Sequence, residues 1–493
     1  MAVAGNVGVG KGLLSIVALV SDQETGEMSS AANVPVMTVS ESPAMIRESR
    51  KLREVVAAFN PERAGAAAYS IIEELYPICR SITGDGVRES LQLLQETVPL
   101  NVHEVPSGTE VFDWIVPDEW NIRDAYIKNS AGERVVDFRR SNLQVLNYSV
   151  PVQRTMSLSE LRPHLFTLPE MPDWIPYRTS YYEETWGFCL SQRQLEQMED
   201  GEYEVCIDSS LEPGHLTYGE YRIQGATDDE VLISTHICHP SLCNDNLSGV
   251  ATAVVLASLL DGVGLRHSYR FVLAPGTIGA IAWLALNEHV LPRIKHGLVL
   301  SCVGDPGRFT YKRSRRGNAE IDRVVEGVLR STGRDFELSD FTPYGYDERQ
   351  YCSPGIDLPV GCFMRTPNGK YPQYHTSADD LTLVTGPALA DSLFHLLRIV
   401  ETLEGNDKYL NLNSKCEPQL GRRGLYRQVG GMNNTGLEEA LLWVLNLSDG
   451  QHSLLDIAEH SRLEFTKINE AARLLAKNGL LQLIDPMTSS HVG

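Results

Sequence analysis

Residues Leu232–Leu260, LISTHICHPSLCNDNLSGVATAVVLASLL, decide the fold of this chain. The apolar run Val231–Ile233 predicts a buried strand, and the apolar stretch that ends this segment predicts a helix. Between them lie His236, His239 and Asp245. Imidazole and carboxylate groups that follow the carboxyl end of a strand are typical of a zinc site in a metal-dependent hydrolase.

Asp245 is expected at or just before a helix N-terminus, where the helix dipole keeps a carboxylate ionised. The alternative is that His236 and His239 are ordinary polar residues and that Asp245 only caps the helix. The segments that follow in the chain favour the metal site.

The composition limits the classes of function. The chain has 493 residues and a formal net charge of −21, so non-specific binding to nucleic acid or to an anionic membrane is not expected. Its length predicts about two to four domains. Nine cysteines without a CxxC pair indicate reduced thiols and a cytoplasmic protein. No transmembrane stretch is evident, and the apolar run Leu13–Val20 lacks a signal-peptide cleavage site.

Changes in pattern along the chain predict six segments. These are a disordered leader (1–60), the first part of the core (61–110), a β-rich insert (111–225), the main part of the core (226–405), a linker (406–431) and a winged-helix-like domain (432–485). The insert is expected to contain strands at Val135–Phe138, Leu143–Leu146 and Tyr203–Ile207.

The main part of the core alternates between strand and helix patterns. The expected strands are Val231–Thr235, Tyr269–Ala274, Gly297–Cys302 and Val360–Met364, and the expected helices are Gly249–Leu260, Ile278–Leu286, Ala319–Leu329 and Pro387–Leu403. This alternation predicts an α/β fold with a mainly parallel central sheet.

The last unit has three amphipathic helix patterns and a short strand, which resembles a winged helix. A DNA-binding role would need a basic surface. The unit has eight acidic and four basic side chains, hence a net charge of −4. We therefore expect a role in packing or protein contact and no nucleic-acid partner.

Two later loops carry further candidate side chains. Asp347 and Glu348 lie in the segment YDERQY, and His375 lies in YHTSADDL. A lone loop histidine is usually a surface residue, but a nearby carboxylate such as Asp379 can orient an imidazole that binds metal.

Several segments together resemble one bacterial family. They are YPICRSITGDGVRESL, WIVPDEWNIRDAYI, SYYEETWGFCL, THICHPSLCNDNLSG, YDERQYCSPG and YHTSADDL, spread over residues 60–485. The chain is similar to an aminopeptidase-like domain family of unknown function, with a β-rich insert and a C-terminal winged helix. Its distant relatives are the co-catalytic zinc exopeptidases and the glutaminyl cyclases.

The resemblance implies site residues one by one. His236, Asp245 and His375 match the first histidine, the bridging aspartate and the last histidine, and His239 is close enough to be a ligand. The expected Glu-Glu pair falls on Gly276 and Thr277. The later aspartate falls near Ser301, with Asp305 just beyond it. The resemblance therefore implies one Zn²⁺ per chain, held by His236 or His239 together with Asp245 and His375.

Gly276 stands where a catalytic residue is expected. In the resembling family this turn reads Pro-Glu-Thr-Ile-Gly, and the glutamate is the general base that a glycine cannot replace. Glu348 or Asp347 could substitute if their loop folds over the metal. The alternative is that both form a structural ion pair with Arg349 or Arg365.

Two functions follow. The first is a zinc-dependent, aminopeptidase-like hydrolase of a peptide or amide bond, impaired at Gly276, in which Asp347, Glu348 and Asp379 receive the substrate ammonium group. The second is a catalytically degenerate metal-binding protein that recognises a peptide-like or carbohydrate intermediate of a biosynthetic pathway. A transcriptional regulator is a third, weaker possibility, and a homo-oligomer is compatible with either function.

Overall fold

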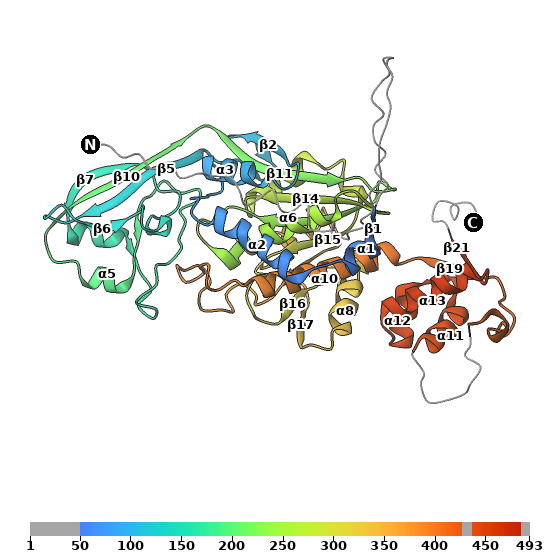
Figure 1. The fold of residues 1–493 in the computed structure, drawn as a ribbon. Helices are drawn as coiled ribbons and strands as arrows, with labels where there is room; N and C mark the ends of the chain where they lie inside the picture. The colour runs from blue at the N-terminus through green and yellow to red at the C-terminus, as the bar shows by residue number, and fades with distance from the viewer. Residues whose placement is uncertain (1–49, 426–435, 485–493) are drawn as a thin grey trace, which may run out of the picture.

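The protein consists of three parts in a row: a β-rich insert at one end, an α/β core in the middle and a small helical domain at the other end (Figure 1). The computed structural model describes residues 50–425 and 436–484. The expected disordered leader lies mostly outside the described residues. Its last part forms β1 (Arg50–Lys51) and α1 (Leu52–Ala57). Part of the expected linker, 426–431, also lies outside them.

The core is built on an eight-stranded sheet with the order β17-β16-β18-β15-β12-β14-β11-β2. Its four central strands, β18, β15, β12 and β14, run parallel, which confirms the α/β core. The flanking strands β11, β2 and β16 join antiparallel, so the whole sheet is mixed. The strand bounds are β2 Asn101–Pro106, β11 His215–Ile223, β12 Glu230–His236, β14 Ser268–Ala274, β15 Ile294–Leu300, β16 Phe309–Lys312, β17 Phe336–Ser339 and β18 Val360–Met364.

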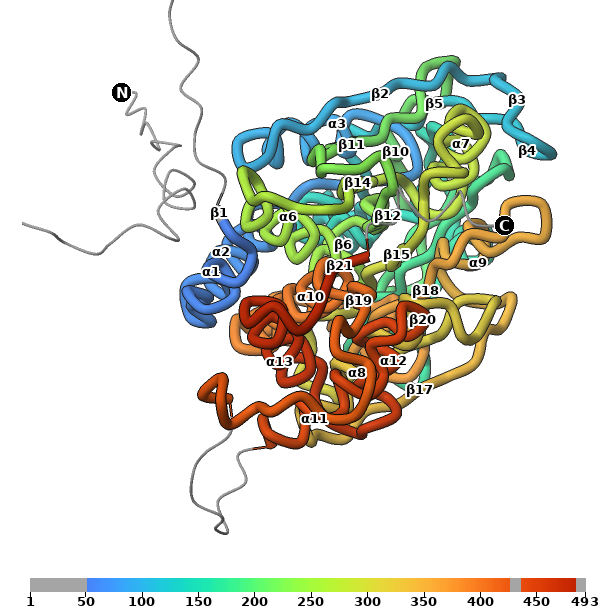
Figure 2. Tube along the Cα trace, turned by 90° about the vertical axis from the view of Figure 1, so that its right-hand side faces the viewer, coloured from blue at the N-terminus to red at the C-terminus, as the bar shows by residue number. Residues whose placement is uncertain are grey.

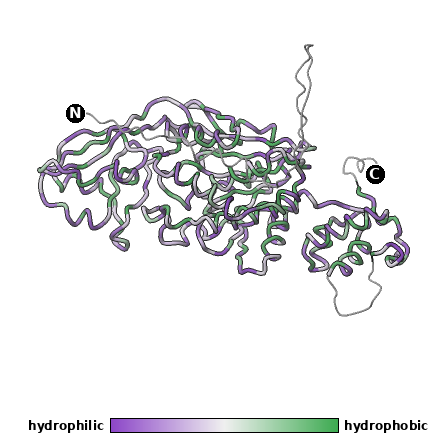
Figure 3. The backbone as a smooth tube through the Cα atoms, viewed as in Figure 1, coloured by the Kyte–Doolittle hydropathy of each residue, from purple (hydrophilic) through white to green (hydrophobic). Residues whose placement is uncertain are grey.

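Helices cover both faces of this sheet. Alternate residues of one strand face opposite sides, so Ile233 packs with the apolar residues of α2, α6, α8 and α10, whereas Leu232 packs with those of α7 and α9. The hydrophobic centre of the protein coincides with these strands (Figure 3). The helix bounds are α2 Pro61–Leu75, α3 Asp85–Leu94, α6 Ser248–Leu260, α7 Ile278–Leu286, α8 Glu320–Ser331, α9 Glu348–Tyr351 and α10 Gly386–Gly405.

The insert has its own four-stranded antiparallel sheet, in the order β6-β5-β10-β7. The bounds are β5 Glu119–Lys128, β6 Arg134–Asp137, β7 Val152–Ser157 and β10 Glu202–Glu212, with short helices α4 Leu158–Leu161 and α5 Gln192–Glu196. Small two-stranded pairs are β3 Glu110–Val111 with β4 Trp114–Ile115, and β8 Leu165–Phe166 with β9 Phe188–Cys189. Strand β11 follows β10 and belongs to the core sheet, although it falls within 111–225.

The strand expected at Leu143–Leu146 is wrong. Residues Asn142–Gln144 form a 3-10 turn, in which the Ser141 hydroxyl accepts a hydrogen bond from the Leu143 N–H. Val145 makes only an isolated bridge to Phe188. The apolar pattern there reflects burial against the insert core and not a strand.

The C-terminal domain is a small helical unit with a three-stranded sheet, β20-β19-β21. Its elements are β19 Lys408–Asn411, α11 Leu437–Leu447, β20 Asp449–Ser453, α12 Leu454–Ser461, α13 Phe465–Lys477 and β21 Leu481–Leu483. Arg323 of α8 forms ion pairs with Asp456 (2.6 Å) and Glu459 (2.5 Å) of α12. The domain therefore lies against α8 and α10 of the core (Figure 2).

Within residues 50–425 and 436–484, one helical segment, Cys243–Leu260, is apolar and long enough to cross a membrane by length and composition. It is 94% buried inside the protein, as expected of a helix at the centre of a core.

A charged network is buried within the core sheet. The Glu230 side chain has no exposed surface, and its carboxylate binds Arg270 Nε at 2.6 Å and Arg222 Nε at 2.8 Å. Arg270 also binds Glu220 at 2.6 Å. Burial alone would raise the pKa of Glu230, but the two guanidinium groups outweigh it and hold that pKa below the ordinary value.

Replacing Arg270 by methionine should destabilise the protein by about 3 kcal/mol, because a buried carboxylate then loses a charged partner. Urea unfolding followed by circular dichroism measures the loss. Arg193→Met is the matched control, since the ion pair of Arg193 with Asp173 is exposed and should contribute nothing measurable. Equal losses in the two variants would contradict this assignment.

Candidate metal centre

The site is built at the carboxyl end of β12, the central strand of the parallel run. His236 is the last residue of β12, and His239 lies in the loop that follows. Asp245 lies in an irregular turn, Cys243–Leu247, directly before α6. His375 comes from the loop that precedes α10, far away in the sequence.

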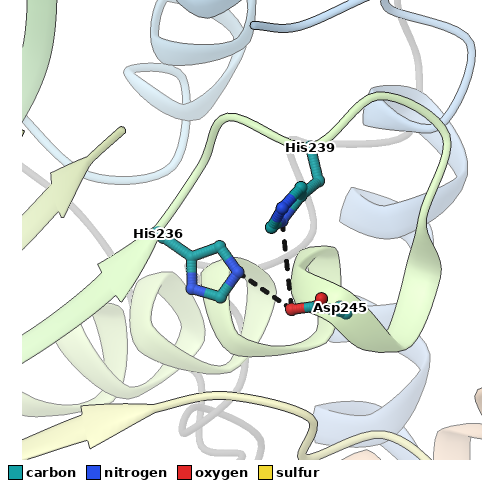
Figure 4. A group of neighbouring side chains, drawn as sticks. All are labelled: His236, His239 and Asp245. Atoms are coloured by element: carbon teal, nitrogen blue, oxygen red, sulfur yellow. Dashed lines mark hydrogen bonds and ion pairs between the residues drawn. The ribbon is translucent and has the colours of Figure 1, made fainter. Parts of the chain in front are cut away.

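The Asp245 carboxylate lies at the centre of three imidazoles. Its Oδ1 is 2.9 Å from His236 Nε2 and 3.9 Å from His239 Nδ1. Dashed lines in Figure 4 mark these two contacts. Its Oδ2 is 2.9 Å from His375 Nε2. The four residues predicted as metal ligands are thus brought together. Nδ1 of His239 is buried and has no hydrogen-bond partner.

Burial and charge set the protonation states of this cluster. Asp245 is fully buried, which would raise its pKa, but the three histidines outweigh burial and keep the pKa well below the ordinary value. Burial lowers the pKa of His239 well below its usual range. An ionised carboxylate beside a neutral imidazole is the state in which these groups bind a metal ion.

Asp379 fixes the turn that presents Asp245. Its Oδ1 accepts a hydrogen bond from the Asn244 backbone N–H (2.6 Å), and its Oδ2 accepts one from the Asp245 N–H (2.9 Å). Asp379 thus holds the backbone, whereas the group that orients the His375 ring is Asp245 itself. Burial raises the pKa of Asp379 to about 7.

Asp305 is engaged in structural contacts. Its carboxylate accepts hydrogen bonds from Asn244 Nδ2 (3.1 Å), Gly307 N–H (2.7 Å) and Thr366 Oγ1 (2.6 Å). These bonds join the turn after β15 to neighbouring loops. The geometry gives no contact between Asp305 and the histidine cluster.

Gly276 and Asp347 lie beside His236. A Cβ atom added to Gly276 would be 3.1 Å from His236 Cβ and 3.6 Å from Asp347 Oδ1. Asp347 is 2% exposed, and its Oδ1 has no hydrogen-bond partner. Burial raises the pKa of Asp347 to about 6, although the charge of His236 opposes this shift. The carboxyl of Asp347 thus adjoins the place where the family glutamate would start.

Glu348 forms a buried ion pair with Lys312. Its Oε1 is 2.7 Å from Lys312 Nζ, and the side chain is completely buried. The expected structural ion pair therefore exists, but its partner is Lys312 and not Arg349 or Arg365. Arg365 instead pairs with Asp391. The lysine was missed because it lies on β16, a strand between β17 and β18 that was not among the strands expected from the sequence.

Aromatic rings around the histidines were also missed. Tyr346 stacks on His236 with ring centroids 5.0 Å apart, and Tyr374 stacks on His375 at 4.0 Å. Tyr177, from the insert, contacts both His239 and His375. Tyr346 and Tyr374 directly precede predicted site residues, which was the available signal, whereas no sequence pattern pointed to Tyr177.

Comparison with known proteins agrees with this geometry. Residues 69–406 match the family model of the domain of unknown function DUF4910, and residues 407–483 match a winged helix-turn-helix. A Clostridium acetobutylicum protein, named for polysaccharide biosynthesis and an aminopeptidase-like domain, is 54% identical over 426 residues, which cover 86% of this chain and 98% of the relative. The winged helix and the aminopeptidase-like core expected from the sequence are thereby confirmed.

Two solved structures are similar to the fold. A crystal structure of a Clostridium acetobutylicum protein described as a peptidase is 52% identical, covers 88% of this chain and 99% of its own, and has a TM-score of 0.84. The zinc aminopeptidase BSAP of Bacillus subtilis is 14% identical, covers 69% and 95%, and has a TM-score of 0.51. The second likeness concerns the fold alone.

Replacing Asp347 by asparagine should stabilise the metal-free protein more at pH 8 than at pH 5. The folded-state pKa is raised above the unfolded value, so native stability falls as the pH rises between them and stays lower above the folded pKa. The gain should grow by about 1 kcal/mol between the two pH values. Urea unfolding in the presence of a chelator measures it, with the exposed Asp173→Asn as the control. A gain that is equal at both pH values would contradict the buried, protonatable carboxyl.

Proposed function

Because the chain belongs to the DUF4910 family, with its aminopeptidase-like core, we propose that it is a zinc-dependent hydrolase of a peptide or amide bond. The observation that carries the proposal is the fully buried Asp245 carboxylate with three imidazoles around it. Nitrogen and oxygen donors of this kind suit Zn²⁺, and three protein ligands plus a water are typical of catalytic sites.

One zinc ion per chain is the proposed content, held by His236 or His239 with Asp245 and His375. Gly276 and Thr277 offer no carboxylate where the co-catalytic exopeptidases have a glutamate pair, and Asp305 is engaged elsewhere. When bound, zinc lowers the pKa of its water to about 7 and polarises a carbonyl oxygen.

Asp347 is the proposed proton carrier in place of the missing glutamate. A general base works best when its pKa is close to the working pH, and burial brings the pKa of Asp347 to about 6. Its Oδ1 is free to accept a proton, since no other group binds it. Glu348, whose carboxylate is bound to Lys312, serves to hold this loop.

A catalytically degenerate binding protein is the second candidate. Gly276 favours it, because the turn lacks the glutamate of the resembling family. The Clostridium acetobutylicum relative carries polysaccharide biosynthesis in its name, which supports a carbohydrate or peptide-like intermediate as the ligand. Tyrosine rings next to the histidines would suit either ligand, because aromatic faces bind apolar and sugar surfaces alike.

The proposed partners are a small peptide-like or amide substrate and, for assembly, a second copy of the chain. A nucleic-acid or membrane partner is not proposed, since the chain has a net charge of −21. Phe465 and Asn469 of α13 pack against the core, so this part of the helix surface is not accessible to the groove of a DNA duplex. All nine cysteines are free thiols, which supports a cytoplasmic location.

Purified protein should contain about one zinc ion per chain, and His375→Ala should lose it. Atomic emission spectrometry after dialysis against metal-free buffer measures the ratio. His395→Ala is the matched control, because His395 is a buried histidine on α10 that contacts Phe309 and not Asp245. Zinc that stays bound to His375→Ala, or is absent from the wild type, would refute the site.

Asp347→Asn should lower kcat/KM on aminoacyl-nitroanilides by about 10²–10⁴-fold, because positioned proton transfer contributes that much. Gly276→Glu added to that variant should restore part of the rate, since the Cβ of the new side chain would lie 3.6 Å from the position of Asp347 Oδ1. Gly276→Gln has the same shape without the charge and should restore nothing. If every variant, including Gly276→Glu alone, is silent on a broad amide panel, the degenerate binding function is the correct one.

A further inference from the structure

The β-rich insert reaches the histidine cluster through one of its loops. The backbone N–H of Tyr177 donates a hydrogen bond to the His375 carbonyl oxygen (2.8 Å), and the Ser377 N–H donates one to the Ile175 carbonyl (2.8 Å). The Ile175 N–H in turn donates to Ser377 Oγ at 3.0 Å. These bonds clamp residues 175–177 of the insert onto the loop that presents His375.

The backbone of His375 has an unusual conformation. His375 has a φ of +55°, in the left-handed region that side chains other than glycine rarely adopt. Such a conformation persists where the surrounding structure holds it. The bond from Tyr177 ends on the carbonyl of this very residue, so the insert stabilises the backbone that aims the imidazole at Asp245.

The Tyr177 ring contacts two of the imidazoles at once. It meets His239 and His375 edge to face, with centroids 5.1 Å apart in both cases and interplanar angles of 87° and 82°. Tyr177 itself is only 6% exposed. One side chain of the insert therefore touches both rings, which come from separate loops of the core.

A chain of hydrogen bonds also connects the insert to the backbone of His239. The Tyr177 hydroxyl is 3.0 Å from that of Tyr181, whose side chain lies next to Ser81. Ser81 Oγ donates to Asn147 Oδ1 at 2.5 Å, and Asn147 is another insert residue.

The chain of hydrogen bonds reaches His239 through Arg80 of the core. Asn147 Nδ2 donates to the Arg80 carbonyl oxygen at 3.0 Å, and Arg80 Nε donates to the His239 carbonyl oxygen at 3.1 Å. Arg80 is fully buried, so its position is fixed by these contacts. The insert thus acts on His239 from two directions, through the ring of Tyr177 and through the guanidinium of Arg80.

We propose that the β-rich insert completes the metal centre, with Tyr177 as the positioning residue that orients His239 and His375. This inference rests on the proposed function only for the identity of the bound ion. It assigns the insert a role within the site itself, because Tyr177 adds to the core contacts of these rings one side chain that touches both of them. Supporting groups of this kind typically change metal affinity by about 10–100-fold.

The test compares full-length Tyr177→Leu and Tyr177→Phe by Co²⁺ binding in competition with a chelator. The leucine variant should bind cobalt at least about 10-fold more weakly and show an altered visible absorption spectrum. The phenylalanine variant keeps the ring edge and should stay close to the wild type. Tyr203→Leu is the matched control, because Tyr203 is a buried insert tyrosine that binds the Glu199 carbonyl and touches no imidazole. A wild-type affinity and spectrum in Tyr177→Leu would overturn the proposal.

Two further measurements test the role of the insert if Tyr177→Leu does not fold or if the wild type binds no metal ion. If Tyr177→Leu does not fold, Ser377→Ala removes only the bond to the Ile175 N–H, and an unchanged cobalt affinity there would overturn the clamp. If the wild type binds neither Co²⁺ nor Zn²⁺, the proposed function fails. The imidazole ¹⁵N shifts of His239 and His375 in the metal-free chain then decide. A changed tautomer state in Tyr177→Leu supports the positioning role, and an unchanged one refutes it.

Discussion

The ionised carboxylate of Asp245, buried without exposure, is the constraint on which the site depends. A charge that is removed from water must be paired or must bind a metal ion, or it becomes too costly to retain. Here His236 comes from the end of a strand, and His375 comes from a loop more than a hundred residues later, yet both lie 2.9 Å from this carboxylate. The core therefore has to keep these two loops in fixed positions.

The side-chain amide of Asn246 holds the turn that carries Asp245. Asn246 Nδ2 donates to Thr235 Oγ1 (2.8 Å) and to the Leu300 carbonyl (3.1 Å), and its Oδ1 accepts from the Cys302 N–H (3.2 Å). These bonds tie the turn to β12 and to the end of β15. A site held by strand ends and by a second layer of hydrogen bonds is pre-organised for its ligand. The insert adds to this support through the contacts of Tyr177 with His239 and His375.

The sequence was sufficient for features that depend on local pattern. The buried strand before His236 and the apolar helix after Asp245 follow from periodicity, and the helix Ile278–Leu286 has the bounds expected for it. His236 and Asp245 could be paired because they are nine residues apart at one strand end. His375 could be raised as a candidate from the acidic residues that follow it, but only the family resemblance linked it to His236 and Asp245.

What the sequence could not give are contacts between distant segments. The pairing of Glu348 with Lys312 depends on β16 lying beside β18, and the contact of Tyr177 depends on how the insert folds back. The segment Leu143–Leu146 shows a different limit, since buried apolar residues in an irregular turn imitate a strand. The composition and the apolar periodicity of a short stretch show neither contacts between distant segments nor whether a buried stretch is a strand or a turn.

Asp245 and the histidines around it are proposed to hold a single zinc ion. The most direct measurement is anomalous X-ray diffraction from crystals of the protein, recorded above and below the zinc absorption edge. A single bound zinc ion should give one peak per chain, about 2.0–2.2 Å from an Asp245 oxygen and from nitrogens of His375 and of His236 or His239. A zinc-equilibrated crystal with no peak at Asp245, or with its peak bound to other residues, would contradict it.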